Sequence, residues 1–187
     1  MKLEPTKLRD LYILSPRRFE DARGFFSESW SKKVLSGLGL EYDWVQDNHS
    51  LSSTPGTVRG LHFQAAPHAQ AELVRCGRGR MLDVAVDIRK GSPSFGAWVG
   101  VELSASNGLQ LLIPAGFLHG FVTREPDTEI IYKCTDYYAP DSEGTVRYDC
   151  PDIAIDWGLG DTTPVLSDKD INAPGLAEFE TPFEYES

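Results

Sequence analysis

Cysteine is scarce in this chain, with three residues among 187, at positions 76, 134 and 150. Their number is odd and no two of them form a C-x-x-C pair, so the sequence offers neither a disulfide framework nor a paired-thiol metal site. Apolar runs long enough to cross a membrane are also missing, and the N-terminal stretch MKLEPTKLRDLYIL has no apolar core of a secretion signal. We therefore expect a cytoplasmic protein that is not exported.

Basic residues are in the minority. The chain has 18 Lys and Arg against 28 Asp and Glu, which gives a formal net charge of −10. Such a surface repels the phosphates of nucleic acids and of acidic membranes, so neither is expected as a partner. An anionic ligand then needs a local basic pocket.

Linkers, internal repeats and low-complexity segments are absent. With 41% apolar residues, a chain of this length can bury one core without disulfides or metals. We expect a single domain over residues 1–187, with an N-terminal strand extension. The sequence becomes irregular and acidic from about Asp141, which predicts a C-terminal segment that wraps around the domain.

Helical periodicity is rare, whereas short segments rich in β-branched and aromatic residues recur between turn-forming stretches. DVAVDIR (residues 83–89) alternates strictly and predicts a half-buried strand, with Val84, Val86 and Ile88 on its apolar face. The one good helix candidate is SESWSKKVLSGLG (residues 27–39), where Ser31 can cap the N-terminus. An all-β sandwich or barrel with a few short helices is predicted.

Two histidine motifs refine this fold class. GLQLLIPAGFLH places Gly108, Pro114, Gly116 and His119 at the spacing of the second motif of the cupin superfamily. Gly56, followed after five residues by His62, resembles the start of the first cupin motif. The resemblance implies a double-stranded β-helix, or jelly roll, with the two histidines facing each other inside it.

A metal site is not predicted from these motifs. Metal-binding cupins continue the first motif with a second histidine two residues later and a glutamate just beyond. Here the position of the second histidine holds Gln64, and positions 68 and 69 hold His68 and Ala69, so two of the four expected ligands are absent. Two imidazoles alone make a weak site for a transition metal. A metal-dependent oxygenase of the cupin type therefore remains only an alternative, to be tested by metal analysis.

Six runs in order along the chain resemble the dTDP-4-dehydrorhamnose 3,5-epimerase family. They are FEDARGFFSESW, VQDNHSLSSTPGTVRGLHFQ, LDVAVDIRKGSPSFGAWVGVELS, LLIPAGFLHGF, IIYKCTDYYAPDSEGTVRYDCP and PVLSDKD. The resemblance implies a cofactor-free isomerase that inverts C3 and C5 of a dTDP-linked 4-keto-6-deoxyhexose in rhamnose biosynthesis. It also implies a homodimer formed through strands.

The resemblance assigns three catalytic residues. His62 is the implied base, Asp170 the residue that orients its ring, and Tyr132 the acid on the opposite face of the sugar. An unperturbed imidazole titrates near pH ~6.5, close to the working pH of a general base. By local sequence alone, Tyr132 reads as core packing and Asp170 as an exposed turn residue of SDKD.

The resemblance also implies a set of substrate-binding residues. Guanidinium groups suit the diphosphate because they pair with its oxygens bidentately, and Tyr138 matches an aromatic ring that stacks on thymine. The other implied contacts are Arg23, Glu28, Gln46, Asn48, Arg59, Glu72, His119, Glu143 and Lys169.

Glu72 departs from the family pattern, which has a lysine there that stabilises the enolate. Three explanations are open: Glu72 is protonated and donates a hydrogen bond to the ketone oxygen, or it pairs with Arg59 or another pocket cation, or the chain is impaired or substrate-shifted. Arg75 is no substitute, because it points to the other face of a regular strand.

Two further functions stay open as alternatives. One is a sugar-nucleotide-binding cupin with impaired catalysis because of Glu72, and the other is an epimerase that acts on one carbon only. Exchange of solvent deuterium into C3 and C5 separates both from the main prediction.

Overall fold

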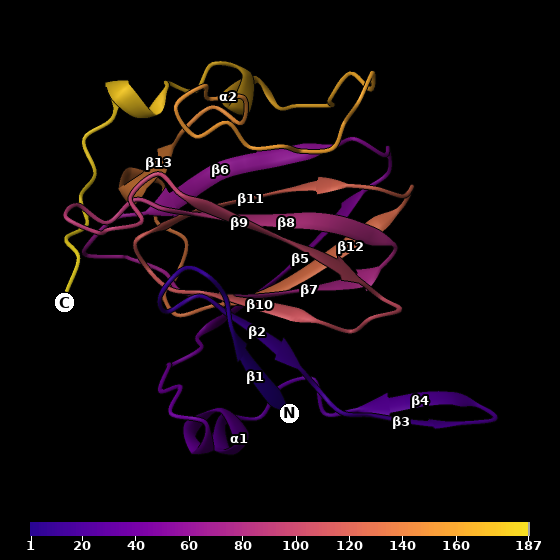
Figure 1. Ribbon diagram of the computed structural model, residues 1–187. Coiled ribbons are helices and arrows are strands. Elements are labelled where there is room, and N and C mark those ends of the chain that lie inside the picture. The colour runs from indigo at the N-terminus through magenta and orange to yellow at the C-terminus, as the bar shows by residue number, and fades with distance from the viewer. Residues whose placement is uncertain (187) are drawn as a thin grey trace.

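The computed structural model describes residues 1–186 and consists mainly of antiparallel strands in two facing sheets (Figure 1). In spatial order, the first sheet contains β1 (Lys2–Pro5), β2 (Tyr12–Ser15), β10 (Gln110–Ile113), β7 (Glu72–Arg78), β12 (Thr128–Cys134) and β5 (Gln46–Ser52). The second contains β13 (Glu143–Thr145), β6 (Val58–Gln64), β11 (Phe117–Thr123), β8 (Arg80–Asp87) and β9 (Trp98–Ser104). The predicted all-β class is confirmed.

Helices are short and lie outside the sheets. They are α1 (Lys32–Gly37), α2 (Asp168–Ile171) and the 3₁₀ turns η1 (Pro140–Ser142) and η2 (Leu176–Glu178). Helix α1 begins as predicted, with the Ser31 side chain accepting a hydrogen bond from the Val34 amide. Within the described residues, no helix is long and apolar enough to cross a membrane.

The space between the two sheets holds a large apolar cluster. Side chains from both sheets meet there, among them Val74, Met81, Leu103 and Phe117, all almost fully buried. Because each sheet contributes one face to this cluster, removing either sheet would expose the other to water. The two sheets therefore stabilise each other.

The outer faces of both sheets are also covered. Helix α1 packs Leu35 against Leu73 and Leu112 on the first sheet. On the second sheet, the segment after β13 covers strand residues with buried side chains such as Trp157. This burial leaves few apolar residues of the central strands in contact with water.

Strand β8 differs from the half-buried strand predicted for DVAVDIR. Val84 and Val86 pack under the C-terminal segment, while Asp83, Ala85 and Asp87 on the other face are also fully buried. The alternation was read correctly, but the prediction that one face meets water was wrong. The reason is that this polar face lies between the two sheets, where Ala85 belongs to the core cluster, while the C-terminal segment covers the opposite, apolar face.

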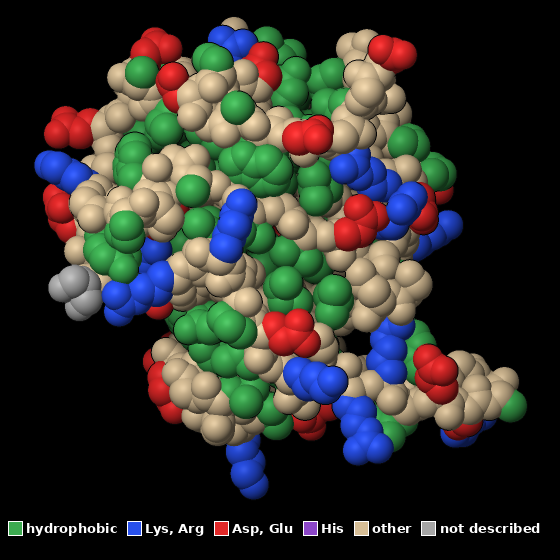
Figure 2. Space-filling view, in the orientation of Figure 1, with side chains coloured by type: hydrophobic (Ala, Val, Ile, Leu, Met, Phe, Trp, Pro, Cys, Tyr) green, Lys and Arg blue, Asp and Glu red, His purple; other side chains and the backbone are tan. Residues whose placement is uncertain are grey.

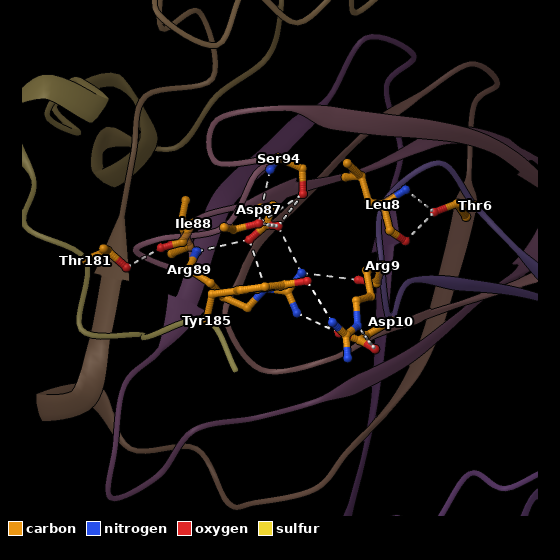
Figure 3. Close-up of polar contacts among 11 residues, drawn as sticks. Thr6, Leu8, Arg9, Asp10, Asp87, Ile88, Arg89, Ser94, Thr181 and Tyr185 are labelled. Atoms are coloured by element: carbon orange, nitrogen blue, oxygen red, sulfur yellow. Dashed lines mark hydrogen bonds and ion pairs between the residues drawn. The ribbon is translucent and has the colours of Figure 1, made fainter. Parts of the chain in front are cut away.

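Arg89, just after β8, lies in an ion-pair network that fixes both ends of the chain (Figure 3). Its guanidinium donates to both carboxylate oxygens of Asp87 at 2.9 Å and to Asp10 at 2.8 Å. The ring of Tyr185 lies 5.1 Å from the guanidinium carbon, and Arg9 donates to the Tyr185 hydroxyl. The N-terminal loop and the C-terminal tail therefore meet at one arginine.

The hairpin of β3 (Arg18–Asp21) and β4 (Gly24–Ser27) stands apart from the two sheets (Figures 1 and 2). It projects beside the body of the molecule with its aromatic side chains exposed: Phe19 by 51%, Phe25 by 58% and Phe26 by 70%. Two strands alone are marginally stable in water. Apolar surface on such an isolated hairpin is typical of a segment that contacts another molecule.

Candidate active site

A cavity of about 500 Å³ opens between the two sheets and under the C-terminal segment. Most of the predicted site residues line it. They are Gln46, Asn48, Arg59, His62, Glu72, His119, Tyr132, Tyr138, Glu143 and Asp170. Strands of both sheets, helix α2 and the loop after β12 supply these side chains, so segments distant in sequence converge on one space.

Three predicted residues do not line this cavity. Arg23 lies in the turn of the β3–β4 hairpin, where it is exposed and pairs with Asp21 at 2.5 Å. Glu28 directly follows β4 and is also exposed. Lys169 lies at the cavity edge, with its Nζ 2.5 Å from Glu143 Oε1. Within one chain, Arg23 and Glu28 are thus not brought together with the other predicted residues.

His62 and Asp170 are in direct contact, with His62 Nε2 2.6 Å from Asp170 Oδ1. Asp170 is only 3% exposed, so the reading of SDKD as an exposed turn is wrong. Ser167 caps α2 by accepting a hydrogen bond from the Asp170 amide, and its hydroxyl donates to Asp170 Oδ2 at 2.8 Å. Both carboxylate oxygens are therefore fixed in place.

The charge of Asp170 determines which His62 nitrogen carries a proton. Burial raises the pKa of Asp170, but hydrogen bonds from His62 and Ser167 outweigh burial and hold it below its usual value. An ionised carboxylate can only accept, so Nε2 of His62 must donate. Nδ1, which has no hydrogen-bond partner among the described residues, is then free to take up a proton.

Tyr132 belongs to β12 of the first sheet, whereas His62 belongs to β6 of the second. Burial raises the pKa of the Tyr132 phenol to about 12, with a smaller contribution from the nearby Glu72 carboxylate. The phenol therefore stays protonated at neutral pH and can donate a proton. Two side chains that can exchange protons thus line the same cavity from opposite sheets.

Glu72 contacts His119 and not Arg59. Glu72 Oε2 lies 2.5 Å from His119 Nδ1, and His119 Nε2 lies 2.8 Å from Asp83 Oδ1. Although burial lowers the pKa of His119, the carboxylates of Asp83 and Glu72 raise it to about 10. His119 is therefore a cation held between two acids, which is the "other pocket cation" that the sequence left open.

Arg59 is loosely held. Its guanidinium donates to Ser52 Oγ at 3.5 Å and to the Leu51 carbonyl at 3.4 Å, both long contacts. Of the described residues that line the cavity, Arg59 is the one lysine or arginine. A single guanidinium in a lining that also contains three carboxylates is little positive charge for a diphosphate.

The outer part of the cavity is formed by a group of polar contacts around Tyr138. Its hydroxyl donates to Glu143 Oε2 at 3.2 Å, and its amide donates to Gln46 Oε1 at 3.2 Å. Gln46 in turn donates to Asn48 Oδ1 at 3.1 Å. The Tyr138 residue is 60% exposed, so the ring is accessible to a flat ligand such as a base.

Gln64 is occupied by backbone groups. Its Nε2 donates to the carbonyls of His68 and Tyr137, and its Oε1 accepts from the Ala139 amide. His68 itself pairs with Asp136 at the surface, 3.2 Å away. The described residues contain no group of three or more His, Cys, Asp or Glu placed to hold a metal ion. The donor set at the cupin motif therefore does not fit a metal.

Sequence reasoning missed Asp83 as a site residue, although it is fully buried and holds His119. The signal was present, because an acidic residue within an otherwise apolar strand must be paired or protonated when both faces are buried. Gln70 and Ser167, which also line the cavity, carry no comparable signal in the sequence.

The sequence and the fold have close counterparts. The family model described as dTDP-4-dehydrorhamnose 3,5-epimerase matches residues 5–178. A dTDP-4-dehydrorhamnose 3,5-epimerase of Sinorhizobium fredii is 48% identical over 99% of this chain and 94% of its own length. The corresponding protein of Salmonella typhimurium is 51% identical over 91% of this chain and 93% of its own length.

A solved structure matches the whole chain. The dTDP-6-deoxy-D-glucose-3,5-epimerase of Legionella pneumophila, in complex with dTDP-4-keto-L-rhamnose, is 43% identical, with a TM-score of 0.94. The match covers 100% of this chain and 99% of that one. The cupin-type fold predicted from the two histidine motifs is thereby confirmed.

Proposed function

The chain belongs to the dTDP-4-dehydrorhamnose 3,5-epimerase family, and from this premise we propose its reaction in terms of its own residues. It inverts C3 and C5 of dTDP-4-dehydro-6-deoxyglucose and gives dTDP-4-dehydro-L-rhamnose, without a cofactor. The main observation behind this proposal is that the His62–Asp170 pair lines the cavity from the second sheet, while Tyr132 lines it from the first.

The chemistry follows from the ketone at C4. Hydrogens at C3 and C5 are both α to this carbonyl, so a base can remove each one if the enolate is stabilised. His62 Nδ1 takes the proton, while Asp170 holds the ring through Nε2 and stabilises the imidazolium that forms. Tyr132 returns a proton from the opposite side of the ring, and this change of face inverts the carbon.

Substrate binding divides the cavity into two parts. The sugar lies among His62, Tyr132 and His119, and thymine stacks on the exposed ring of Tyr138. Arg59 pairs with the diphosphate. The remaining polar groups at the outer end bind the nucleotide and sugar hydroxyls: Gln46, Asn48, Glu143 and Lys169.

We propose a homodimer in which the β3–β4 hairpin of one subunit completes the cavity of the other. The hairpin projects with Phe25 and Phe26 exposed, and it carries Arg23 near its tip. The cavity of one chain has Arg59 as its one described lysine or arginine, which leaves a diphosphate undercompensated. A second copy that brings Arg23 and Glu28 to the cavity would cover the exposed aromatic side chains of the hairpin and add a cation for the diphosphate.

We also place the enzyme in the cytoplasm. All three cysteines are free and buried, which is compatible with a reducing compartment. Its substrate is a charged nucleotide sugar that does not cross a membrane unaided.

Deuterium exchange tests the proposed reaction. The purified enzyme is incubated with the keto-sugar nucleotide in D₂O, and NMR follows C3, C5 and the product. We expect deuterium at both carbons together with inversion, and loss of both in His62→Ala. A sugar-nucleotide-binding protein gives no deuterium, and a single-carbon epimerase labels one carbon; either result would contradict the proposal. Exchange at the wild-type rate in His62→Ala would remove His62 as the base.

A further inference from the structure

Glu72, His119 and Asp83 form a line of three titratable groups that ends at the cavity. Asp83 is fully buried on β8, His119 lies next to it on β11, and Glu72 follows on β7 with its side chain 18% exposed. Each imidazole nitrogen of His119 meets one carboxylate, so the ring donates to both only when it carries two protons. The reaction assigned above uses none of the three for proton transfer.

Two carboxylate oxygens in this line lack a well-aligned hydrogen bond. Asp83 Oδ2 and Glu72 Oε2 are both buried without a partner among the described residues, although Glu72 Oε2 lies within ion-pair distance of His119. When all three groups are ionised, one positive charge faces two negative charges in a site poor in water. Such a surplus negative charge beside a developing enolate repels it.

A proton on Glu72 removes this conflict. With Oε2 facing His119 Nδ1–H, the carboxyl group presents its other oxygen, Oε1, to the cavity that Glu72 lines. A neutral carboxylic acid in that position is a hydrogen-bond donor toward a carbonyl oxygen. The same group then becomes a carboxylate next to an imidazolium once it has given its proton away.

We propose that Glu72, held in place by His119 and Asp83, donates a proton to the carbonyl oxygen of the substrate as the adjacent C–H bond breaks. We call this line of three residues the relay, although Glu72 alone exchanges a proton with the substrate. This relay rests on the proposed function and identifies Glu72 as a further catalytic residue. His119 and Asp83 are positioning residues that act through Glu72.

The proton transfers balance in each half-reaction. His62 takes the proton from carbon, the electron pair of the C–H bond forms the enol double bond, and the carbonyl oxygen gains the proton of Glu72. The enol then returns its proton to Glu72 while its carbon takes a proton from Tyr132. Solvent takes up the proton of His62 and returns one to Tyr132, which restores both groups before the next carbon reacts. The Glu72–His119 ion pair therefore reaches full strength only in the intermediate, as selective stabilisation of the transition state requires.

Other charged and titratable groups face this line and set its pH dependence. Tyr132 and Cys134 on β12 lie near Glu72, and burial raises the pKa of both to about 12, with a smaller contribution from Glu72 in its carboxylate form. Arg59 on β6 is the nearby permanent cation in the cavity. As the pH rises through the pKa of His119, which burial lowers but its two carboxylate partners raise to about 10, the imidazolium loses a proton and the rate falls.

Glu72→Gln tests the relay, because an amide keeps the shape and a donor but cannot give up a proton. We expect a fall in kcat of about a hundredfold, with KM within about twofold of the wild type. The high-pH decline that comes from the relay proton is expected to disappear in this variant. Asp83→Asn removes a negative charge, so the decline should move to lower pH.

The matched control is Glu129→Gln, which breaks another carboxylate–imidazole pair, with His49 at 3.1 Å, outside the cavity. Its rate and pH profile should equal those of the wild type. A Glu72→Gln enzyme with wild-type kcat and an unchanged high-pH decline would overturn the relay alone. If Glu72→Gln does not bind dTDP, Asp83→Asn decides the question. A high-pH decline in rate at the same pH as in the wild type would then overturn the relay. No exchange in the wild type would overturn the proposed function and the relay with it.

Discussion

His62 Nε2 lies 2.6 Å from Asp170 Oδ1, although the two residues are 108 positions apart. The histidine is fixed in β6 of the barrel, and the aspartate comes from the C-terminal segment that covers the same sheet. The orientation of the proposed base therefore depends on a segment outside the barrel. We therefore expect contacts in this segment to affect the rate of the reaction as well as stability.

Asp170→Asn should abolish most of the exchange without changing nucleotide binding. An amide can donate to Nε2 of His62, which moves the ring proton to Nδ1 and blocks the nitrogen that acts as base. We expect a fall in exchange of about a thousandfold at both carbons. The dTDP affinity, measured by calorimetry, is the control for folding. Exchange at the wild-type rate would mean that Asp170 does not set the tautomer.

Tyr132→Phe should separate proton removal from proton return. The variant keeps His62 and Asp170, so deuterium still enters the substrate from the His62 side with retained configuration. Inversion should fall by at least about a hundredfold, because no group on the opposite face delivers a proton. NMR of the sugar ring resolves label and configuration in the same sample. Product formed at the wild-type rate would assign the acid to another group.

Arg89→Met should lower stability more than activity. Asp87 is fully buried, and removing its guanidinium partner leaves a charge that only the backbone amide of residue 89 and the hydroxyls of Ser92 and Ser94 still bind. Breaking such a pair costs about 3 kcal/mol. Urea unfolding measures the loss, and Arg80→Met, whose ion pairs are half-exposed, is the control expected to lose under about 1 kcal/mol.

The same pair sets an acid limit to stability. Burial raises the pKa of Asp87, but hydrogen bonds from Arg89 and Ser92 outweigh it and hold the pKa below the ordinary 3.8. A lowered folded-state pKa contributes stability above the unfolded value, and this stability is lost as pH falls through the folded value. The difference in unfolding free energy between wild type and Asp87→Asn should therefore be largest at neutral pH and shrink below about pH 4.

Much of the fold follows from local sequence. Alternating and β-branched segments predicted an all-β barrel, and Ser31 predicted the start of α1, because these signals act over a few residues. The burial of both faces of β8 was not predictable in the same way. Its polar face lies between the two sheets, and its apolar face is covered by a C-terminal segment with little periodicity of its own, whose burial depends on the finished barrel.

The site was predictable only in part. The histidines of the two motifs line the cavity, because strand alternation fixes which side chains point between the sheets. The burial of Asp170 and the contact of Glu72 with His119 come from tertiary structure, and no local pattern in SDKD or AQAE encodes them. The catalytic and binding roles remain predictions that the experiments above test.

Mixed dimers test whether the hairpin of one subunit serves the cavity of the other. Arg23→Ala and His62→Ala are co-expressed with different tags, and the dimer that carries both is purified. If Arg23 reaches the partner's cavity, one site of this dimer has both His62 and Arg23, and the other has neither. If Arg23 serves its own cavity, every site lacks one of the two.

The expected result is about half of the wild-type activity in the purified mixed dimer, assayed at substrate levels where both parent variants are nearly inactive. The physical reason is that a diphosphate facing Arg59 alone lacks the second cation that the hairpin supplies. Phe26→Asp places a charge on the apolar side of the hairpin, and light scattering should then show monomers with weak dTDP binding. A mixed dimer no more active than its parents, or a wild-type monomer at micromolar concentration, would remove the hairpin from the site.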